Sequence, residues 1–127
     1  MTSKKAAPPR PAAKRQPPPL AQWEVVSVPF PFSNQPGTKR RPALVLSESR
    51  FNRQGHAVLA MITTAGHQPW PGDVTVSDLK AAGLTAPCLV RLKLFTLDQR
   101  LIVKKIGQLA ATDRQQVSSQ LQTYLPW

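Results

Sequence analysis

Short apolar stretches, separated by turn-forming residues, constrain the fold of this chain more than any other feature of its sequence. The stretches are rich in Val, Ile and Leu, which suit the half-buried surface of a β-strand. Six candidate strands follow one another, none longer than seven residues: 24–30, 43–46, 57–63, 73–76, 88–93 and 101–106. Six short strands within about 85 residues predict a mainly β fold in the form of a small barrel.

Local signals predict where the first strand lies and where a helix begins. Pro29 cannot donate a backbone hydrogen bond, which favours an edge position or a bulge for residues 24–30. Near the end of the chain, Thr112 is a candidate N-cap, with Gln115 as its capping-box partner. The apolar residues that follow fall near one helical face: Val117, Leu121 and Tyr124. The sequence therefore predicts one C-terminal α-helix.

The distribution of charge divides the chain into a tail and a folded part. The 127 residues include 17 Lys and Arg against 6 Asp and Glu, a formal net charge of +11. Residues 1–20 contain five basic residues, six prolines and no acid, so we expect a disordered, proline-rich tail. Residues 21–127 form the predicted domain and keep a charge of +6. This charge predicts an anionic partner, with nucleic acid ahead of a membrane surface or an acidic protein.

Several classes of protein are disfavoured by what the sequence contains. A single cysteine, Cys88, cannot form an intrachain disulfide or a multi-cysteine zinc site, and its apolar strand predicts a buried side chain. No apolar run approaches the roughly 18 residues of a membrane helix, and the N-terminus does not resemble a signal peptide. We therefore expect a cytoplasmic protein that does not associate with membranes.

Metal and cofactor chemistry also find little support. The six acidic residues are scattered without a pair at short spacing, which disfavours a two-metal nuclease. His56 and His67 have no ligand at metal-binding spacing and are interpreted as surface histidines. The glycines are isolated, so no phosphate-binding loop is predicted. The sequence predicts neither a metal nor a cofactor.

A basic cluster at residues 38–42 (TKRRP) is the strongest candidate for chemistry. Pro42 biases Arg41 toward an extended backbone, and a guanidinium held there can grip a phosphate with two hydrogen bonds. A solvated charged surface is the alternative interpretation. The sheet can place Thr63, Thr64 and Arg91 opposite this cluster, although threonine is also an ordinary strand residue.

Five motifs occur in a fixed order: residues 24–33 (EVVSVPFPFS), 37–47 (GTKRRPALVLS), 61–64 (MITT), 90–93 (VRLK) and 106–109 (IGQL). Together they resemble the MazF/PemK family of toxin-antitoxin ribonucleases over about residues 22–125. The resemblance implies a small SH3-like barrel with a C-terminal helix that dimerises and cleaves single-stranded RNA, with mRNA the expected substrate, without a metal. It also implies a cognate antitoxin whose acidic segment occupies the same groove.

The resemblance also implies roles for three residues. Arg41 matches the catalytic arginine of the Arg-Pro motif, Thr63 matches the threonine or serine of the second motif, and Arg91 matches the active-site arginine of the PemK branch. Internal attack by a ribose 2′-hydroxyl needs only proton transfer and charge stabilisation. Because arginine does not readily lose its proton, Arg41 and Arg91 are expected to stabilise the transition state, and Thr63 to orient the phosphate or relay a proton.

Residues around these three are candidates for binding RNA: Phe32, Lys39, Arg40, Thr64, Trp70 and Lys93. Phe32 and Trp70 are possible stacking platforms for bases, although packing in a core or dimer explains them equally well. Two positions depart from the family pattern. Trp23 stands where the family usually has a glycine. Lys93 stands where the PemK branch has an aspartate, which removes the obvious general base.

A second function stays open at this stage. Toxins that poison gyrase share the barrel fold that the resemblance implies. The alternative function is therefore that of a non-catalytic barrel that acts by binding a protein or RNA.

Overall fold

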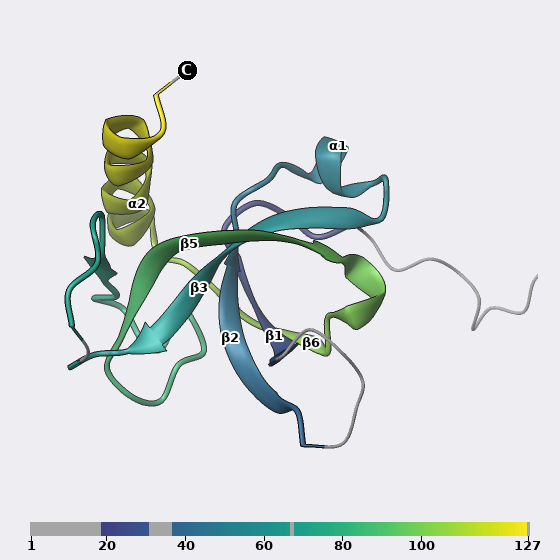
Figure 1. Cartoon of the computed structure of the whole chain (residues 1–127), viewed down its shortest axis with the longest axis horizontal. Helices are drawn as coiled ribbons and strands as arrows, with labels where there is room; N and C mark the ends of the chain where they lie inside the picture. The colour runs from purple at the N-terminus through teal and green to yellow at the C-terminus, as the bar shows by residue number, and fades with distance from the viewer. Residues whose placement is uncertain (1–18, 31–36, 67, 127) are drawn as a thin grey trace, which may run out of the picture.

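The described strands form one curled antiparallel sheet. The computed structural model describes residues 19–30, 37–66 and 68–126, and within them the strand order is β4-β5-β3-β2-β1-β6. The strands are β1 (Glu24–Phe30), β2 (Lys39–Val45), β3 (His56–Thr64), β4 (Val74–Thr75), β5 (Cys88–Asp98) and β6 (Lys104–Gln108). Figure 1 shows the sheet curling into a half-barrel, with the C-terminal helix α2 (Ala111–Tyr124) at one end. The predicted mainly β barrel-like fold with a C-terminal helix is confirmed.

The predicted strands all occur, but five of them have different bounds, and β3 and β4 differ by only one residue at each end. β2 begins at Lys39, so the basic cluster lies in a strand and not in a turn, because Lys39 to Arg41 pair with β1. β5 runs on to Asp98 and pairs with the whole of β3. β6 starts only at Lys104, since the short 3-10 helix η2 (Gln99–Leu101) occupies the preceding residues.

The edge position predicted for the strand that contains Pro29 is wrong for the strand as a whole, but it holds for the part of the strand around Pro29. β1 lies between β2 and β6, so it is not an edge strand. However, β6 pairs with β1 only from Glu24 to Ser27, and the register shifts between Val25 and Val26. Pro29 therefore lies beyond the β6 ladder, where its missing donor costs nothing on that side.

The predicted capping box of the C-terminal helix is wrong. The N-cap is Ala110, and the helix begins at Ala111, one residue before Thr112. Asp113, in the first turn, is buried and accepts hydrogen bonds from the backbone of Ser77 and Asp78 at 3.0 to 3.1 Å and from the Ser77 hydroxyl at 2.7 Å. A carboxylate in the first helical turn is therefore used to tie α2 to the segment after β4. The other described helix, α1 (Ser49–Asn52), is a single turn.

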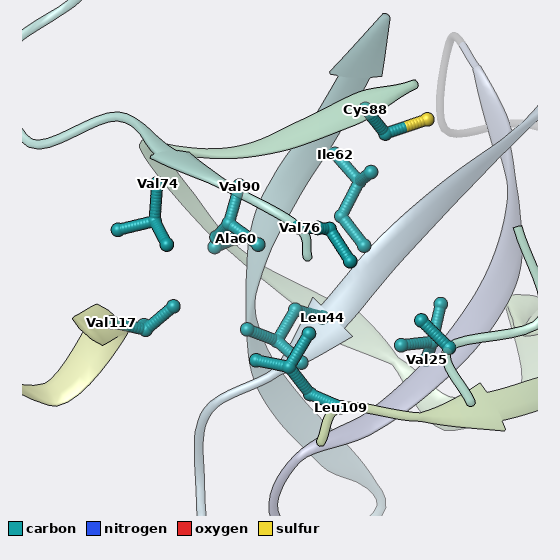
Figure 2. Close-up of a cluster of buried hydrophobic side chains, with 11 residues drawn as sticks. Val25, Leu44, Ala60, Ile62, Val74, Val76, Cys88, Val90, Leu109 and Val117 are labelled. Atoms are coloured by element: carbon teal, nitrogen blue, oxygen red, sulfur yellow. The ribbon is translucent and has the colours of Figure 1, made fainter. Parts of the chain in front are cut away.

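Both faces of the sheet bury apolar side chains. Figure 2 shows the cluster on the face that α2 covers, including Val25, Leu44, Ile62 and Val117. A second cluster lies on the opposite face: Val26, Val28, Ala43, Val45, Ala57, Leu59 and Leu97. We call these the helix-side face and the opposite face. Because side chains alternate along a strand, these clusters fix the face of every neighbouring residue.

The segment before β1 is also packed. Leu20, which composition places in the tail, packs against the opposite-face cluster, and its carbonyl accepts a hydrogen bond of 2.7 Å from the side chain of buried Asn52.

Candidate active site

The site forms where β2 and β3 separate. These strands pair only between Ala43–Val45 and Leu59–Met61. Beyond this ladder, β2 continues along β1 and β3 continues along β5. Residues 40–42 and residues 62–64 therefore face one another across a gap. Continuing the register of Ala43 with Met61 places Arg41 opposite Thr63.

A pocket of about 290 Å³ occupies this gap. Arg40, Arg41, Thr63 and Thr64 all line it, so four of the predicted site residues come together. The remaining lining residues come from all the strands except β4 and from the loop before β5: Ser27, Pro42, Ile62, Gly83, Leu84, Thr85, Ala86, Cys88 and Ile106. Among these described residues there is no carboxylate, and the guanidinium and hydroxyl groups make the pocket a site for an anion such as phosphate.

The residues that line the pocket belong to both faces of the sheet. Arg41 and Thr63 alternate in phase with Ala43 and Leu59, which places them on the opposite face. Arg40 and Thr64 alternate in phase with Leu44 and Ile62 on the helix-side face. The gap between the strands is what allows both sets to line one pocket.

Arg41 is oriented by an aromatic ring. Val28 is its partner on β1, and the Arg41 guanidinium carbon lies 5.4 Å from the centre of the Phe30 ring. Such a cation-π contact restrains the guanidinium without using its N–H donors. None of the described carboxylates forms an ion pair with Arg41. Its donors are thus not committed to a carboxylate.

Arg91 lies outside this pocket and is held by an acid. Its Nε and Nη2 donate to the two carboxylate oxygens of Asp73 at 3.1 and 2.9 Å, and Nη2 also donates to the Gln68 carbonyl at 2.9 Å. Burial opposes ionisation of Asp73, but hydrogen bonds from Arg91 and the Trp70 backbone outweigh it and hold the Asp73 pKa below its usual value. The hydrogen bonds to Asp73 in turn raise the pKa of Arg91.

Trp70 and Lys93 lie together, away from Arg41 and Thr63. The Lys93 ammonium is 4.5 Å from the Trp70 ring centre, a cation-π contact. Trp70 lines a separate apolar groove of about 350 Å³ with Pro71, Leu92, Leu94, Tyr124 and Leu125. Lys39 is exposed at the start of β2, on the same face as Arg41. The predicted platform Phe32 lies outside the described residues.

A wall of the pocket was not predicted from the sequence. The loop that contains Gly83 packs on β6, where the Gln108 backbone donates to the Ala81 carbonyl at 2.9 Å. A Cβ atom on Gly107 would overlap the backbone of Ala82. Cys88 is buried beside this wall, as expected, and burial raises the pKa of its thiol. Nothing in the spacing of these residues marks them as neighbours of Arg41.

The sequence also did not reveal that Asp73 is the partner of Arg91. It is separated from Arg91 by 18 positions, and it stands alone between Gly72 and Val74. No sequence signal connects it to the arginine.

Comparison with known proteins identifies what this architecture resembles. A family model described as PemK-like, MazF-like toxin of type II toxin-antitoxin system matches residues 21–125. A comparison with curated proteins gave no match.

Solved structures share the fold at low sequence identity. A MazE-MazF complex from Deinococcus radiodurans has a TM-score of 0.67 and 23% identity, over 84% of this chain and 95% of that one. An endoribonuclease in complex with its cognate antitoxin from a Mycobacterial species has a TM-score of 0.65 and 22% identity, over 85% and 98%. The toxin MazF-mt6 of Mycobacterium tuberculosis has a TM-score of 0.63 and 20% identity, over 79% and 93%. In the described part of the chain, no helix is long and apolar enough to span a membrane.

Proposed function

Because the chain belongs to the PemK-like, MazF-like family of type II toxin-antitoxin toxins, we propose that it is a metal-independent, sequence-selective endoribonuclease that acts on single-stranded RNA in the cytoplasm. The observation that carries this proposal is the convergence of Arg40, Arg41, Thr63 and Thr64 in one pocket. Arginine and threonine side chains supply the hydrogen-bond donors that a phosphodiester needs.

In the proposed reaction, the ribose 2′-oxygen attacks the adjacent phosphorus and the bond to the 5′-oxygen breaks. The 2′-proton leaves to solvent, with Thr63 as orienting or relaying group, and the leaving 5′-oxygen takes up a proton from solvent. Arg41 stabilises the charge that develops on the phosphate oxygens. The products are a cyclic phosphate and a 5′-hydroxyl. Solvent is the assigned proton acceptor because the described pocket residues include no carboxylate, and Asp73 is engaged by Arg91.

The proposed partners follow from the same premise. Two of the similar structures contain a toxin with its antitoxin, which supports a cognate antitoxin with an acidic segment that covers this basic pocket. We also propose a homodimer, to be tested by light scattering of the purified protein.

The decisive experiment incubates the purified protein with a long single-stranded RNA in EDTA. Discrete fragments ending in cyclic phosphate are expected, and intact RNA over a wide range of sequences would exclude the proposal. Arg41→Ala should lower the cleavage rate by about a hundredfold or more, since one transition-state donor is commonly worth that much. Arg53→Ala, which removes an equal charge from the exposed C-cap of α1, outside the pocket, is the matched control and should cleave like the parent.

A binding-only toxin is the second candidate, and one observation favours it. Lys93 is a cation where the PemK branch has an aspartate, and the described pocket residues include no other carboxylate that could act as a base. If expression of Arg41→Ala and Thr63→Ala arrests growth as strongly as the parent, the mechanism is binding and not cleavage.

A further inference from the structure

The loop between β3 and β4 is clamped to the sheet by Arg91. The guanidinium makes two hydrogen bonds to Asp73 and one to the carbonyl of Gln68, so one side chain of β5 holds both ends of residues 68–73. The side chains of Arg91 and Asp73 are only 11% and 17% exposed. The clamp is therefore a largely desolvated pair, which has a more defined geometry than an ion pair at the surface.

The clamp determines the position of Trp70. The Trp70 backbone N–H donates to Asp73 Oδ2 at 2.9 Å, and the Asp73 N–H donates back to the Trp70 carbonyl at 3.1 Å. The backbone that carries the indole is thus fixed through the same carboxylate that Arg91 holds. Trp70 as a whole residue remains 41% exposed.

The surroundings of Trp70 suit a nucleobase. The indole and Tyr124 line an apolar groove of about 350 Å³, with Leu92 and Leu94, and the Lys93 ammonium lies over the ring at 4.5 Å. The ammonium covers one face of the ring, so a base stacks on the other face. An aromatic ring with a nearby cation is a combination by which proteins hold single-stranded nucleic acid, stacking the base and attracting the phosphate.

Sheet register relates this platform to the pocket. Thr63 is paired with Leu89, so Arg91 lies one strand across and two residues along from Thr63. Such diagonal neighbours are about 7–8 Å apart. The clamp therefore stands beside the pocket without lining it.

We propose that Arg91 is a positioning residue and that, with Asp73, it holds Trp70 as a stacking platform for a base of single-stranded RNA, with Lys93 as the adjacent cation. The inference rests on the proposed ribonuclease function for its ligand. It reassigns Arg91, because Nε and Nη2 are already bonded to a carboxylate and a carbonyl, and Asp73 balances the charge of the guanidinium.

Binding of an RNA that cannot react separates this role from catalysis. The probe is a single-stranded 2′-O-methyl RNA with a fluorescent label at one end, and affinity is measured by fluorescence anisotropy. Trp70→Ala is expected to weaken binding about tenfold, the usual effect of losing one stacked base. Asp73→Asn and Arg91→Gln should weaken it by a similar factor, and the double variant should be no worse than either single one. Such non-additivity identifies a shared unit.

Matched controls separate the clamp from general charge and hydrophobicity. Arg100→Gln removes the same charge from an exposed Arg-Asp pair with a 2.8 Å contact, and Phe51→Ala removes another exposed aromatic ring. Both should bind like the parent. Arg91→Lys keeps the charge but loses the two-point contact, and it provides a folded comparison if Arg91→Gln does not fold.

Steady-state kinetics of RNA cleavage distinguish a positioning role of Arg91 from a catalytic one. The clamp variants are expected to raise KM together and leave kcat nearly unchanged. A large fall in kcat for Arg91→Gln, with Asp73→Asn like the parent, would make Arg91 catalytic and overturn the inference. RNA affinity unchanged in Trp70→Ala would also overturn it and assign the groove to a protein partner. A parent protein that cleaves no RNA contradicts the proposed function alone, because binding of the unreactive RNA still tests the platform.

Discussion

At the scale of single residues, Trp23 is the position where sequence and backbone disagree most. It is the one described non-glycine residue with a positive φ, 75°. Its N–H donates to the Val45 carbonyl at 2.7 Å, its carbonyl accepts from Leu109 at 2.9 Å, and its ring packs on the helix-side cluster. The family usually has glycine here, and the structure gives the reason: the strand entrance needs a left-handed residue.

Two substitutions separate strain from packing at this position. Trp23→Ala and Trp23→Gly both lose the ring contacts, but only glycine also removes the left-handed strain of about 1–2 kcal/mol. We expect both variants to unfold at lower urea than the parent, and the glycine variant to be the more stable of the two by about 1 kcal/mol. Equal stability of the two variants would contradict the strain.

At the scale of elements, the contact between the loop of Gly83 and β6 decides whether the pocket has a wall. The backbones approach so closely at Gly107 that a Cβ atom would overlap Ala82. Gly107→Ala must therefore push the loop away from the strand. We expect a loss of stability of about 1–3 kcal/mol, typical of overpacking, together with reduced RNA cleavage.

The neighbouring residue offers the control for this prediction. Gln108 is exposed on the same strand and contacts the loop through its backbone N–H, which Gln108→Ala retains. The control should stay within about 0.5 kcal/mol of the parent in urea unfolding. If both variants behave alike, the close approach has no energetic consequence.

The elements also show how far sequence reasoning reaches. The strands were predicted because apolar residues alternate within short runs. Arg41 and Thr63 were predicted from the resemblance of their motifs to the family, and the structure brings both to one pocket. The start of β2 was missed because Lys39 and Arg40 read as a turn, whereas their pairing with β1 makes them a strand. The partnership of Arg91 with Asp73 was missed because it depends on how a loop folds back, which no local pattern encodes.

At the scale of the whole molecule, the ion pairs Arg91–Asp73 and Arg100–Asp98 make the free energy of unfolding depend on pH. The pKa of Asp98 is lowered to about 2, first by the hydrogen bond from the Arg100 side chain, and that of Asp73 is also lowered. A carboxylate whose folded pKa lies below its unfolded value stabilises the fold above the unfolded pKa, and the stabilisation is lost as pH falls through the folded pKa.

The expected consequence is a fall in the urea midpoint between about pH 4 and pH 2. Asp98→Asn should flatten part of this dependence, because the asparagine does not titrate. Glu48→Gln, which alters an exposed pair whose side chains are 83% and 55% accessible, should leave the pH profile unchanged. A parent profile that is flat over this range would contradict the assigned ion pairs.

The charge of the whole chain gives a further prediction. All five basic residues of the tail lie within residues 1–18, while Leu20 packs on the domain, so the deletion should end at residue 18. Removing residues 1–18 should weaken RNA binding more at low salt than at high salt, because contacts with phosphates make binding depend on salt. For single strands, the logarithm of the binding constant falls by about 0.7 per phosphate contact for each tenfold rise in salt. The cleavage pattern should not change, and a shifted pattern would assign sequence reading to the tail.

The pairing of β1 with β6 sets the moment at which the protein acquires its pocket during synthesis. Ser27 and Ile106 both line the pocket, and Ser27 is paired with Lys104, so residues from the first and last strands enclose the same space. Contacts so distant in sequence form late, after the loop between them has closed. A ribosome-bound chain lacking β6 has therefore not yet assembled the pocket.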